Sequence, residues 1–143
     1  MSLAKRFKSG DVVFRQGDAP GAMYVVMEGS LDVIADGLRI ATVDKAGSFV
    51  GEISFLLGKP RLADLVAQTD TKLLVISDMQ AFMKDDPDRA LAVARELARR
   101  LEAMDGEVLK LRRSLAETLP SDDPQTACWR DLPERLRREA GIA

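Results

Sequence analysis

The sequence lacks histidine altogether and contains a single cysteine, Cys128. Without histidine, Ser-His-Asp and Cys-His catalysis are excluded, and so are zinc sites built on histidine and cysteine ligands. A single cysteine cannot form an internal disulfide, and the first residues carry no apolar stretch of a secretory leader, so we expect a reducing, cytoplasmic setting. The sequence therefore predicts neither a catalytic residue nor a metal site of these common kinds.

An excess of one charge and long apolar runs are also lacking. The 143 residues include 21 basic and 23 acidic side chains, a formal net charge of −2, so no global field attracts a nucleic-acid backbone. No apolar run approaches the ~18 residues of a membrane span. With 46% hydrophobic and 31% charged residues, the composition is that of one globular domain. We expect no direct nucleic-acid partner and no membrane segment in this chain.

Glycines punctuate the first half of the chain, between positions 10 and 51, and short alternating or β-branched stretches lie between them. Spacing of this kind is typical of an all-β sandwich or barrel. Asp36-Gly37 has the composition of a tight hairpin turn. The expected strands are Asp11–Phe14, Met23–Met27, Leu31–Ala35, Arg39–Val43, Asp64–Ala67 and Lys72–Ile76.

After Asp78 the pattern becomes helical. Met79–Lys84 predicts a short helix, and Asp86-Pro87 supplies an N-cap residue followed by proline at the first position of a longer helix, which Gly106 weakens. Apolar residues then recur at spacings of three and four, as along a coiled-coil seam. The seam comprises Ala90, Ala94, Leu97, Leu101, Met104, Val108, Leu111 and Leu115. We expect a helix shared in a homodimer, and the alternative is a helix that lies on its own domain.

Residues 49–63 carry the chemistry of the chain. Gly51 and Glu52 precede a short apolar stretch, and Arg61 follows a Gly-Lys-Pro turn. A short helix beside a glycine presents free N–H groups to a phosphate, and an arginine adds a charged clamp. Glu52 suits a neutral donor such as a sugar hydroxyl. These features suggest a sugar-phosphate ligand, but from spacing alone a structural salt bridge between Glu52 and Arg61 in an ordinary turn is the default interpretation.

Two motifs resemble those of the cyclic nucleotide-binding domain family. The first is Val13–Asp18, followed by Met23–Val26 and Gly29. The second is Gly51–Ser54 through Arg61-Leu62-Ala63, which is similar to the phosphate-binding cassette of the family. The resemblance implies a mainly β fold with C-terminal helices, in which a double-stranded β-helix, a jelly-roll-like β-roll, is followed by a long α-helix.

The resemblance also implies roles for individual residues. Glu52 would bind the ribose 2′-hydroxyl and Arg61 the cyclic phosphate. The backbone N–H groups around Ile53 and Ser54 would bind the remaining phosphate oxygens, and Ala63 would allow close approach of the ligand.

The sequence departs from the family pattern at several positions. Leu62 replaces the usual small or hydroxyl residue, which makes cAMP the expected ligand and cGMP the alternative. Asp64 introduces a negative charge three residues after Arg61, although strand alternation can direct it away from the site. The stretch Arg100–Asp105 has no hydroxyl pair to recognise a base.

We interpret residues 5–85 as the cyclic nucleotide-binding β-roll, 86–119 as the dimerisation helix and 120–143 as a linker with a short helix over Leu132–Glu139. Trp129 is a candidate lid over the bound base, unless the tail is a frayed terminus. The chain reads as a non-catalytic sensor excised from a larger protein with an output domain. The main alternative is a degenerate module of the same fold that binds no nucleotide and serves in dimerisation or docking. An enzyme of the related β-helix type is disfavoured because those sites rest on histidine-bound metal.

Overall fold

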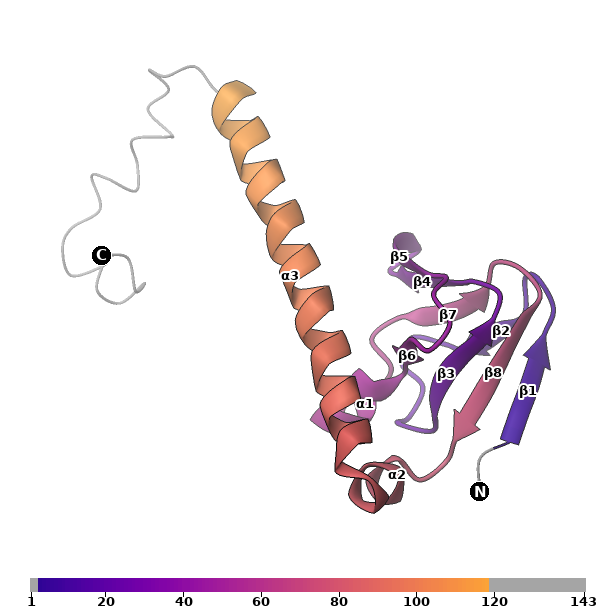
Figure 1. Ribbon diagram of the computed structural model, residues 1–143. Helices are drawn as coiled ribbons and strands as arrows, with labels where there is room; N and C mark the ends of the chain where they lie inside the picture. The colour runs from indigo at the N-terminus through magenta and orange to yellow at the C-terminus, as the bar shows by residue number, and fades with distance from the viewer. Residues whose placement is uncertain (1–2, 119–143) are drawn as a thin grey trace. The chain divides into compact units, whose positions relative to one another are not determined.

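The computed structural model describes residues 3–118. Eight strands form two four-stranded sheets with antiparallel pairing, ordered β1-β8-β3-β6 and β2-β7-β4-β5 (Figure 1). The strands are β1 (Leu3–Phe7), β2 (Val12–Phe14), β3 (Met23–Glu28), β4 (Leu31–Ala35), β5 (Leu38–Val43), β6 (Phe49–Val50), β7 (Asp64–Ala67) and β8 (Thr71–Ile76). The expected β-roll followed by a long helix is confirmed.

The six strands expected from the sequence are present, and their ends differ from the expected ones by no more than one residue. Asp36 and Gly37 form the turn between β4 and β5 with φ angles of 52° and 77°, as a tight hairpin turn requires. Two further strands were not expected. β1 is exposed at four of its five residues and β6 has only two residues, so neither shows the alternation that identifies a half-buried strand.

The buried apolar side chains form two clusters. The first lies between the sheets and consists of Phe7, Val26, Leu31, Val50, Leu65, Ala67 and Leu73. The second joins the start of β3 and the end of β8 to the helices that follow, and consists of Met23, Ile76, Met79 and Val93. The second cluster therefore anchors the helical part of the chain to the β-roll.

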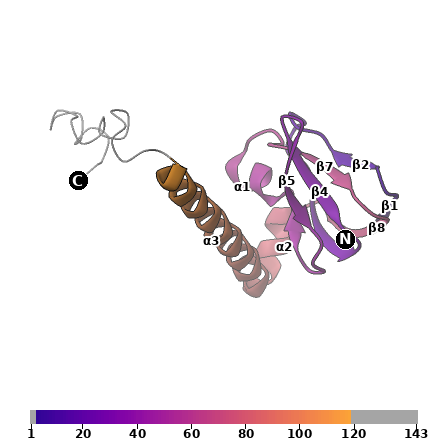
Figure 2. The same ribbon diagram turned by 90° about the horizontal axis from the view of Figure 1, so that it is seen from above.

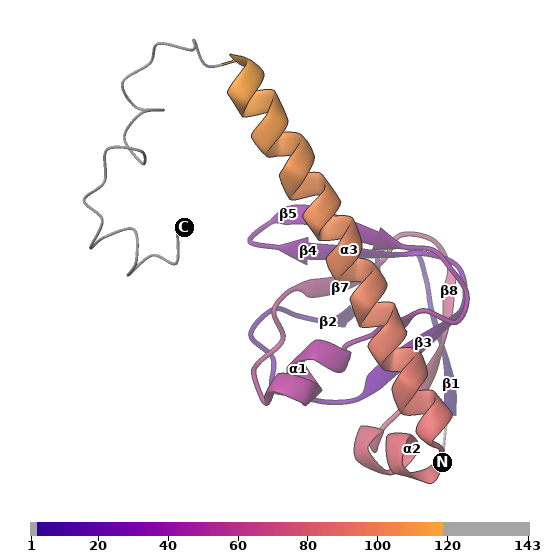
Figure 3. The ribbon, with the colours of Figure 1, turned by 60° about the vertical axis from the view of Figure 1, so that its left-hand side comes forward.

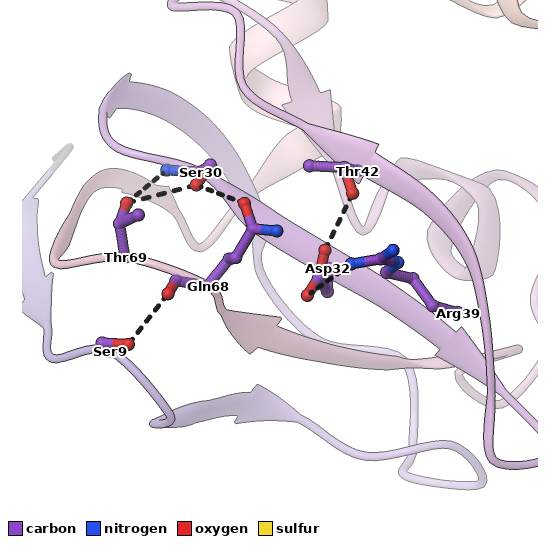
Figure 4. Close-up of polar contacts among 7 residues, drawn as sticks. All are labelled: Ser9, Ser30, Asp32, Arg39, Thr42, Gln68 and Thr69. Carbon is purple, nitrogen blue, oxygen red and sulfur yellow. Dashed lines mark hydrogen bonds and ion pairs between the residues drawn. The ribbon is translucent and has the colours of Figure 1, made fainter.

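Polar contacts fasten the β4–β5 hairpin, which lies beside β7 (Figure 2). Ser30, just before β4, donates its backbone N–H to Oγ1 of Thr69 at 3.0 Å. On β4 itself, Asp32 accepts a hydrogen bond of 2.8 Å from Thr42 and lies 3.9 Å from the guanidinium of Arg39 (Figure 4). The Ser30 contact ties the hairpin to the turn between β7 and β8, and the Asp32 contacts join the two strands of the hairpin.

Three helices are described: α1 (Glu52–Leu57), α2 (Met79–Asp85) and α3 (Pro87–Thr118). Asp86 precedes α3 and accepts a hydrogen bond of 3.0 Å from the backbone N–H of Asp88, so the expected start of the helix is confirmed. α3 continues through Gly106 without interruption. None of the helices within residues 3–118 has the length and apolar character needed to cross a membrane.

The chain divides into two compact units, Met1–Ala98 and Arg99–Ala143, with the boundary inside α3. In the first unit, Val93 is buried and Leu97 packs beside it, whereas Ala94 is exposed. The face that contacts the β-roll therefore includes Val93, which the predicted seam omitted. In the second unit, the remaining seam residues are 47–65% exposed, namely Leu101, Met104, Val108, Leu111 and Leu115.

Three expectations for the end of the chain lie outside the described residues. They are the linker within residues 120–143, the short helix over Leu132–Glu139, and the position of Trp129.

Candidate functional site

The segment between β6 and β7 begins with α1, a helix of six residues bounded by two glycines (Figure 3). Gly51 precedes the helix with a φ of 86°, and Gly58 follows it with a φ of 61°. Both angles lie in the left-handed region, where glycine carries no penalty from a Cβ atom. The backbone N–H of Lys59 donates to the carbonyl oxygen of Ser54 at 3.0 Å. The two glycines thus turn the chain sharply into and out of α1 and bring Arg61 back toward its start.

The side chain of Arg61 is the hub of this site. Its Nη1 atom donates to the carbonyl oxygen of Gly51 and to Oγ of Ser54, both at 2.8 Å. Its Nη2 atom donates to the carbonyl oxygen of Ala22 at 2.7 Å. Arg61 therefore joins the start of α1 to the residue immediately before β3.

Residues of the first sequence motif, Val13–Asp18, contact this arginine. Gly17 donates its backbone N–H to the carbonyl oxygen of Arg61, and Arg61 donates its own to the carbonyl oxygen of Asp18, both at 2.8 Å. The guanidinium carbon of Arg61 lies 4.2 Å from the centre of the Phe14 ring. The two motifs, which are far apart in the sequence, meet at one residue.

The site holds two charged side chains that are almost completely buried: Glu52 is 1% exposed and Arg61 is 5% exposed. Burial lowers the pKa of Arg61 from its ordinary value, while the charges of Tyr24, Asp18 and Glu52 act in the opposite direction. An arginine remains protonated at neutral pH despite such a shift. The site therefore presents a fixed positive charge with a carboxylate beside it.

Space for the guanidinium depends on two glycines. A Cβ atom on Gly51 would lie 2.8 Å from Nη1 of Arg61, and one on Gly21 would lie 3.3 Å from Nη2. The first distance is shorter than two such atoms tolerate. Gly51 is therefore required both by its backbone angle and by the arginine beside it.

The structure brings some of the predicted residues together and separates others. Gly51, Ser54 and Arg61 are in direct contact, and the Glu52 charge acts on Arg61. By contrast, Leu62 is 54% exposed and the side chain of Ile53 is also exposed. Ala63, the remaining predicted residue, is buried.

Asp64 does not oppose Arg61. Its Oδ1 atom accepts a hydrogen bond of 2.6 Å from the backbone N–H of Gln16, and its charge is not among those that shift the pKa of Arg61. The carboxylate instead holds the turn that follows β2. The carboxylate of Asp64, which departs from the family pattern, therefore has a structural role in this turn.

Sequence reasoning missed Phe14 and Ala22 as contacts of Arg61. Phe14 belongs to the first motif and Ala22 directly precedes β3, but only the tertiary structure brings them to Arg61. The available signal was the aromatic residue next to Arg15-Gln16-Gly17. Residues 3–118 contain no cluster of side chains that could hold a metal ion.

Comparisons with known proteins agree with this geometry. A family model described as cyclic nucleotide-binding domain matches residues 4–86. The cAMP-dependent protein kinase regulatory subunit of Debaryomyces hansenii is 34% identical over 67 residues, which cover 47% of this chain and 15% of that protein. The chain spans 15–26% of the length of three curated relatives that it matches.

Two solved structures are similar. The catabolite activator protein of Thermus thermophilus is 31% identical with a TM-score of 0.66, covering 78% of this chain and 55% of that one. The c-di-GMP-responsive global regulator CLP of Xanthomonas campestris is 28% identical with a TM-score of 0.66, covering 87% of this chain and 69% of that one.

Proposed function

The chain belongs to the cyclic nucleotide-binding domain family, and from this premise we propose that it is a non-catalytic cAMP sensor that signals through its C-terminal helix. The observation that carries the proposal is the pair of buried charges, Glu52 and Arg61, at the start and just beyond the end of one short segment. Buried charged side chains are costly to place and are therefore frequent at functional sites. A ligand with an anionic phosphate and a neutral hydroxyl would suit this pair, with the phosphate beside the guanidinium and the hydroxyl beside the carboxylate.

The donors of Arg61 support a phosphate ligand. A guanidinium has five N–H donors, and three of them are directed to Gly51, Ser54 and Ala22. The N–H of Nε and the second N–H of Nη2 make no hydrogen bond within residues 3–118. Two neighbouring donors on a fixed cation suit two oxygens of one phosphate. The cyclic phosphate would add to the existing contacts of Arg61 without displacing them.

Glu52 is the proposed partner of the ribose 2′-hydroxyl, because a carboxylate accepts hydrogen bonds and repels a phosphate. The amides of Ile53 and Ser54 complete the proposed contacts to the phosphate. We propose cAMP over cGMP because Leu62 supplies no hydroxyl group. The similarity to a kinase subunit named as cAMP-dependent supports the same choice. The similarity to a c-di-GMP-responsive regulator makes that dinucleotide the competitor to test.

A contiguous path links the site to α3. Ala22 accepts a hydrogen bond from Arg61, and the next residue, Met23, is fully buried in the cluster that includes Met79 and Val93. A ligand that changes the position of Arg61 would therefore act on the packing at the base of α3. The signal would arise as a shift between two placements of the helix, set by the difference in their ligand affinities.

We further propose that α3 pairs with its counterpart in a second copy of the chain. The seam from Leu101 to Leu115 is exposed and follows the alternating three- and four-residue spacing of a coiled coil. In this proposal residues 5–85 bind the ligand and 86–119 mediate self-association. The output domain would lie in a longer protein.

A degenerate module that only dimerises is the second candidate. The exposed seam favours it, because self-association through Leu101–Leu115 needs no nucleotide. Titration with cyclic nucleotide distinguishes the two candidates, because only the sensor is expected to bind it.

Isothermal titration calorimetry of the full chain tests the proposed sensor. Saturable binding is expected with cAMP, and weaker binding with cGMP and c-di-GMP. The absence of heat at millimolar cAMP would reject the proposal in favour of the degenerate module. Tighter binding of c-di-GMP than of cAMP would reject the proposed ligand.

Three variants locate the site. Arg61→Ala is expected to weaken cAMP binding about 100-fold, since a buried charged donor is lost. Glu52→Gln should cost less, because an amide still accepts from a hydroxyl. Arg6→Ala removes an exposed arginine from β1 and should bind as the wild type does. Equal losses for the changes at 52 and 61 would contradict the ribose assignment.

A further inference from the structure

Arg61 is held in two different ways. The hydrogen bonds to Gly51, Ser54 and Ala22 use the N–H groups of the guanidinium, which lie in its plane. The contact with Phe14 is to the ring, whose centre lies 4.2 Å from Cζ. The ring is itself packed against Tyr24, with the two ring centres 6.2 Å apart and the planes inclined by 30°.

We propose that Phe14 is a positioning residue that orients the guanidinium of Arg61 for the phosphate, an inference that rests on the proposed function. An aromatic ring attracts a cation through its face and accepts none of the in-plane N–H donors. A carboxylate at the same place would compete for those donors. The ring therefore restrains the arginine while leaving Nε and the second N–H of Nη2 for the ligand.

The surroundings of the ring support this role over simple core filling. Phe14 is only half-buried and packs at the margin of the first core cluster. A Cβ atom on Gly51 would lie 3.5 Å from Cε1 of Phe14, so the ring also borders the start of the cassette. The ring, the guanidinium and Gly51 are therefore neighbours at the start of α1, where the ligand would bind.

Binding of cAMP to ring-changing variants tests the inference. Phe14→Leu keeps an apolar side chain but removes the π face, and is expected to weaken binding about 10-fold, as the loss of a partly desolvated cation–π contact predicts. Phe14→Tyr keeps the face and should bind within about twofold of the wild type. Adenosine, which has no phosphate, should show no such difference between the three proteins.

Phe82→Leu is the matched control. Phe82 lies beneath another arginine, Arg89, with 4.7 Å between Cζ and the ring centre. Its replacement removes the same kind of contact outside the site and should leave cAMP affinity unchanged. Thermal unfolding of both leucine variants shows that each is folded at the titration temperature.

The side-chain N–H signal of Arg61 reports on the contact without ligand. In a ¹H–¹⁵N spectrum of the free protein, the ring current of Phe14 should shift the Nε–H proton of Arg61 upfield, and the signal is assigned by its loss in Arg61→Lys. Phe14→Leu should abolish the shift and Phe14→Tyr should preserve it. A signal that is unchanged in Phe14→Leu would overturn the inference.

The remaining outcomes are also distinct. Equal affinity losses in Phe14→Leu and Phe14→Tyr, or wild-type affinity in Phe14→Leu, would overturn the positioning role. An upfield Arg61 signal in a wild-type protein that binds no cyclic nucleotide would reject the proposed function, while confirming that Phe14 positions Arg61.

Discussion

Arg61 donates a hydrogen bond of 2.7 Å to the carbonyl oxygen of Ala22, a residue 39 positions earlier in the chain. Ala22 is followed by Met23, which is inaccessible to solvent and packs in the cluster that holds α2 and the start of α3. A single peptide bond therefore joins Ala22, which accepts the hydrogen bond from Arg61, to Met23, which packs against the helices. The same guanidinium is tied to Gly51 and Ser54 at the start of α1, so it joins the cassette to the base of the helices.

Gly51→Ala is expected to reduce both stability and ligand affinity. The new Cβ atom would lie 2.8 Å from Nη1 of Arg61, at a φ of +86° that disfavours every residue except glycine. Gly37→Ala is the matched control, because Gly37 has a φ of +77° with open space around it. The control should lose about 1–2 kcal/mol of unfolding free energy and no cAMP affinity.

The difference between the two alanine variants measures the crowding of Arg61. Urea denaturation and calorimetric titration should show a larger stability loss in Gly51→Ala and a weakening of cAMP binding of at least about 10-fold, since the guanidinium must move. Equal losses of stability and of cAMP affinity in the two variants would mean that the backbone angle, and not crowding of Arg61, causes the losses.

Ser54→Ala should weaken cAMP binding by about 5- to 10-fold, because Arg61 loses one of its in-plane acceptors in a buried setting. Ser9→Ala is the control: Ser9 is exposed and donates to the carbonyl oxygen of Gln68 at 2.8 Å (Figure 4). Calorimetry should find wild-type affinity in the control. Undiminished binding by Ser54→Ala would show that the other contacts of Arg61 suffice.

The strands that could be predicted are short β-branched or alternating stretches bounded by turn residues. β7 carries buried residues at every second position and β8 nearly so, and such a pattern is visible in the sequence. β1 is an exposed edge whose position is set by pairing with β8. No local pattern encodes that pairing, so β1 was missed.

The candidate site was predictable only in part, because some of its contacts join residues that are far apart in the sequence. Glu52 and Arg61 stand in a recognisable motif, and resemblance to a family was enough to identify them. The contact of Phe14 with Arg61 joins the end of β2 to the segment just before β7, and although the motif contains Phe14, one sequence does not show which residue its ring contacts. Val93 was missed because the seam was taken through Ala90, Ala94 and Leu97, whereas the residues of α3 that pack in the second core cluster are Val93 and Leu97.

Val93→Ala tests the anchoring of α3. Val93 is 2% exposed and its truncation should cost about 2 kcal/mol of unfolding free energy, from lost burial and the cavity left behind. Val12→Ala makes the same change at an exposed position of β2 and should cost about 0.5 kcal/mol or less. Urea denaturation compares them, and equal midpoints would contradict the packing of α3 on the β-roll.

Leu111→Glu tests whether the exposed seam of α3 pairs two copies of the chain. Leu111 is 63% exposed within the second unit, so a glutamate there disturbs no described core and the domain should remain folded. In a coiled coil, the same glutamate would be buried opposite its counterpart, which is costly for an unpaired charge. A dimeric wild type should therefore become a folded monomer in light scattering with sedimentation analysis.

Leu109→Glu is the control on the same helix, because Leu109 is 55% exposed and lies one position beyond the seam residue Val108, on a different face. It introduces the same charge and removes the same side chain, so it should leave the dimer intact. A wild type that is monomeric at high micromolar concentration would contradict the proposed pairing. Dissociation by both variants alike would mean that the two copies associate through a different face of α3, since the seam predicts sensitivity at Leu111 and tolerance at Leu109.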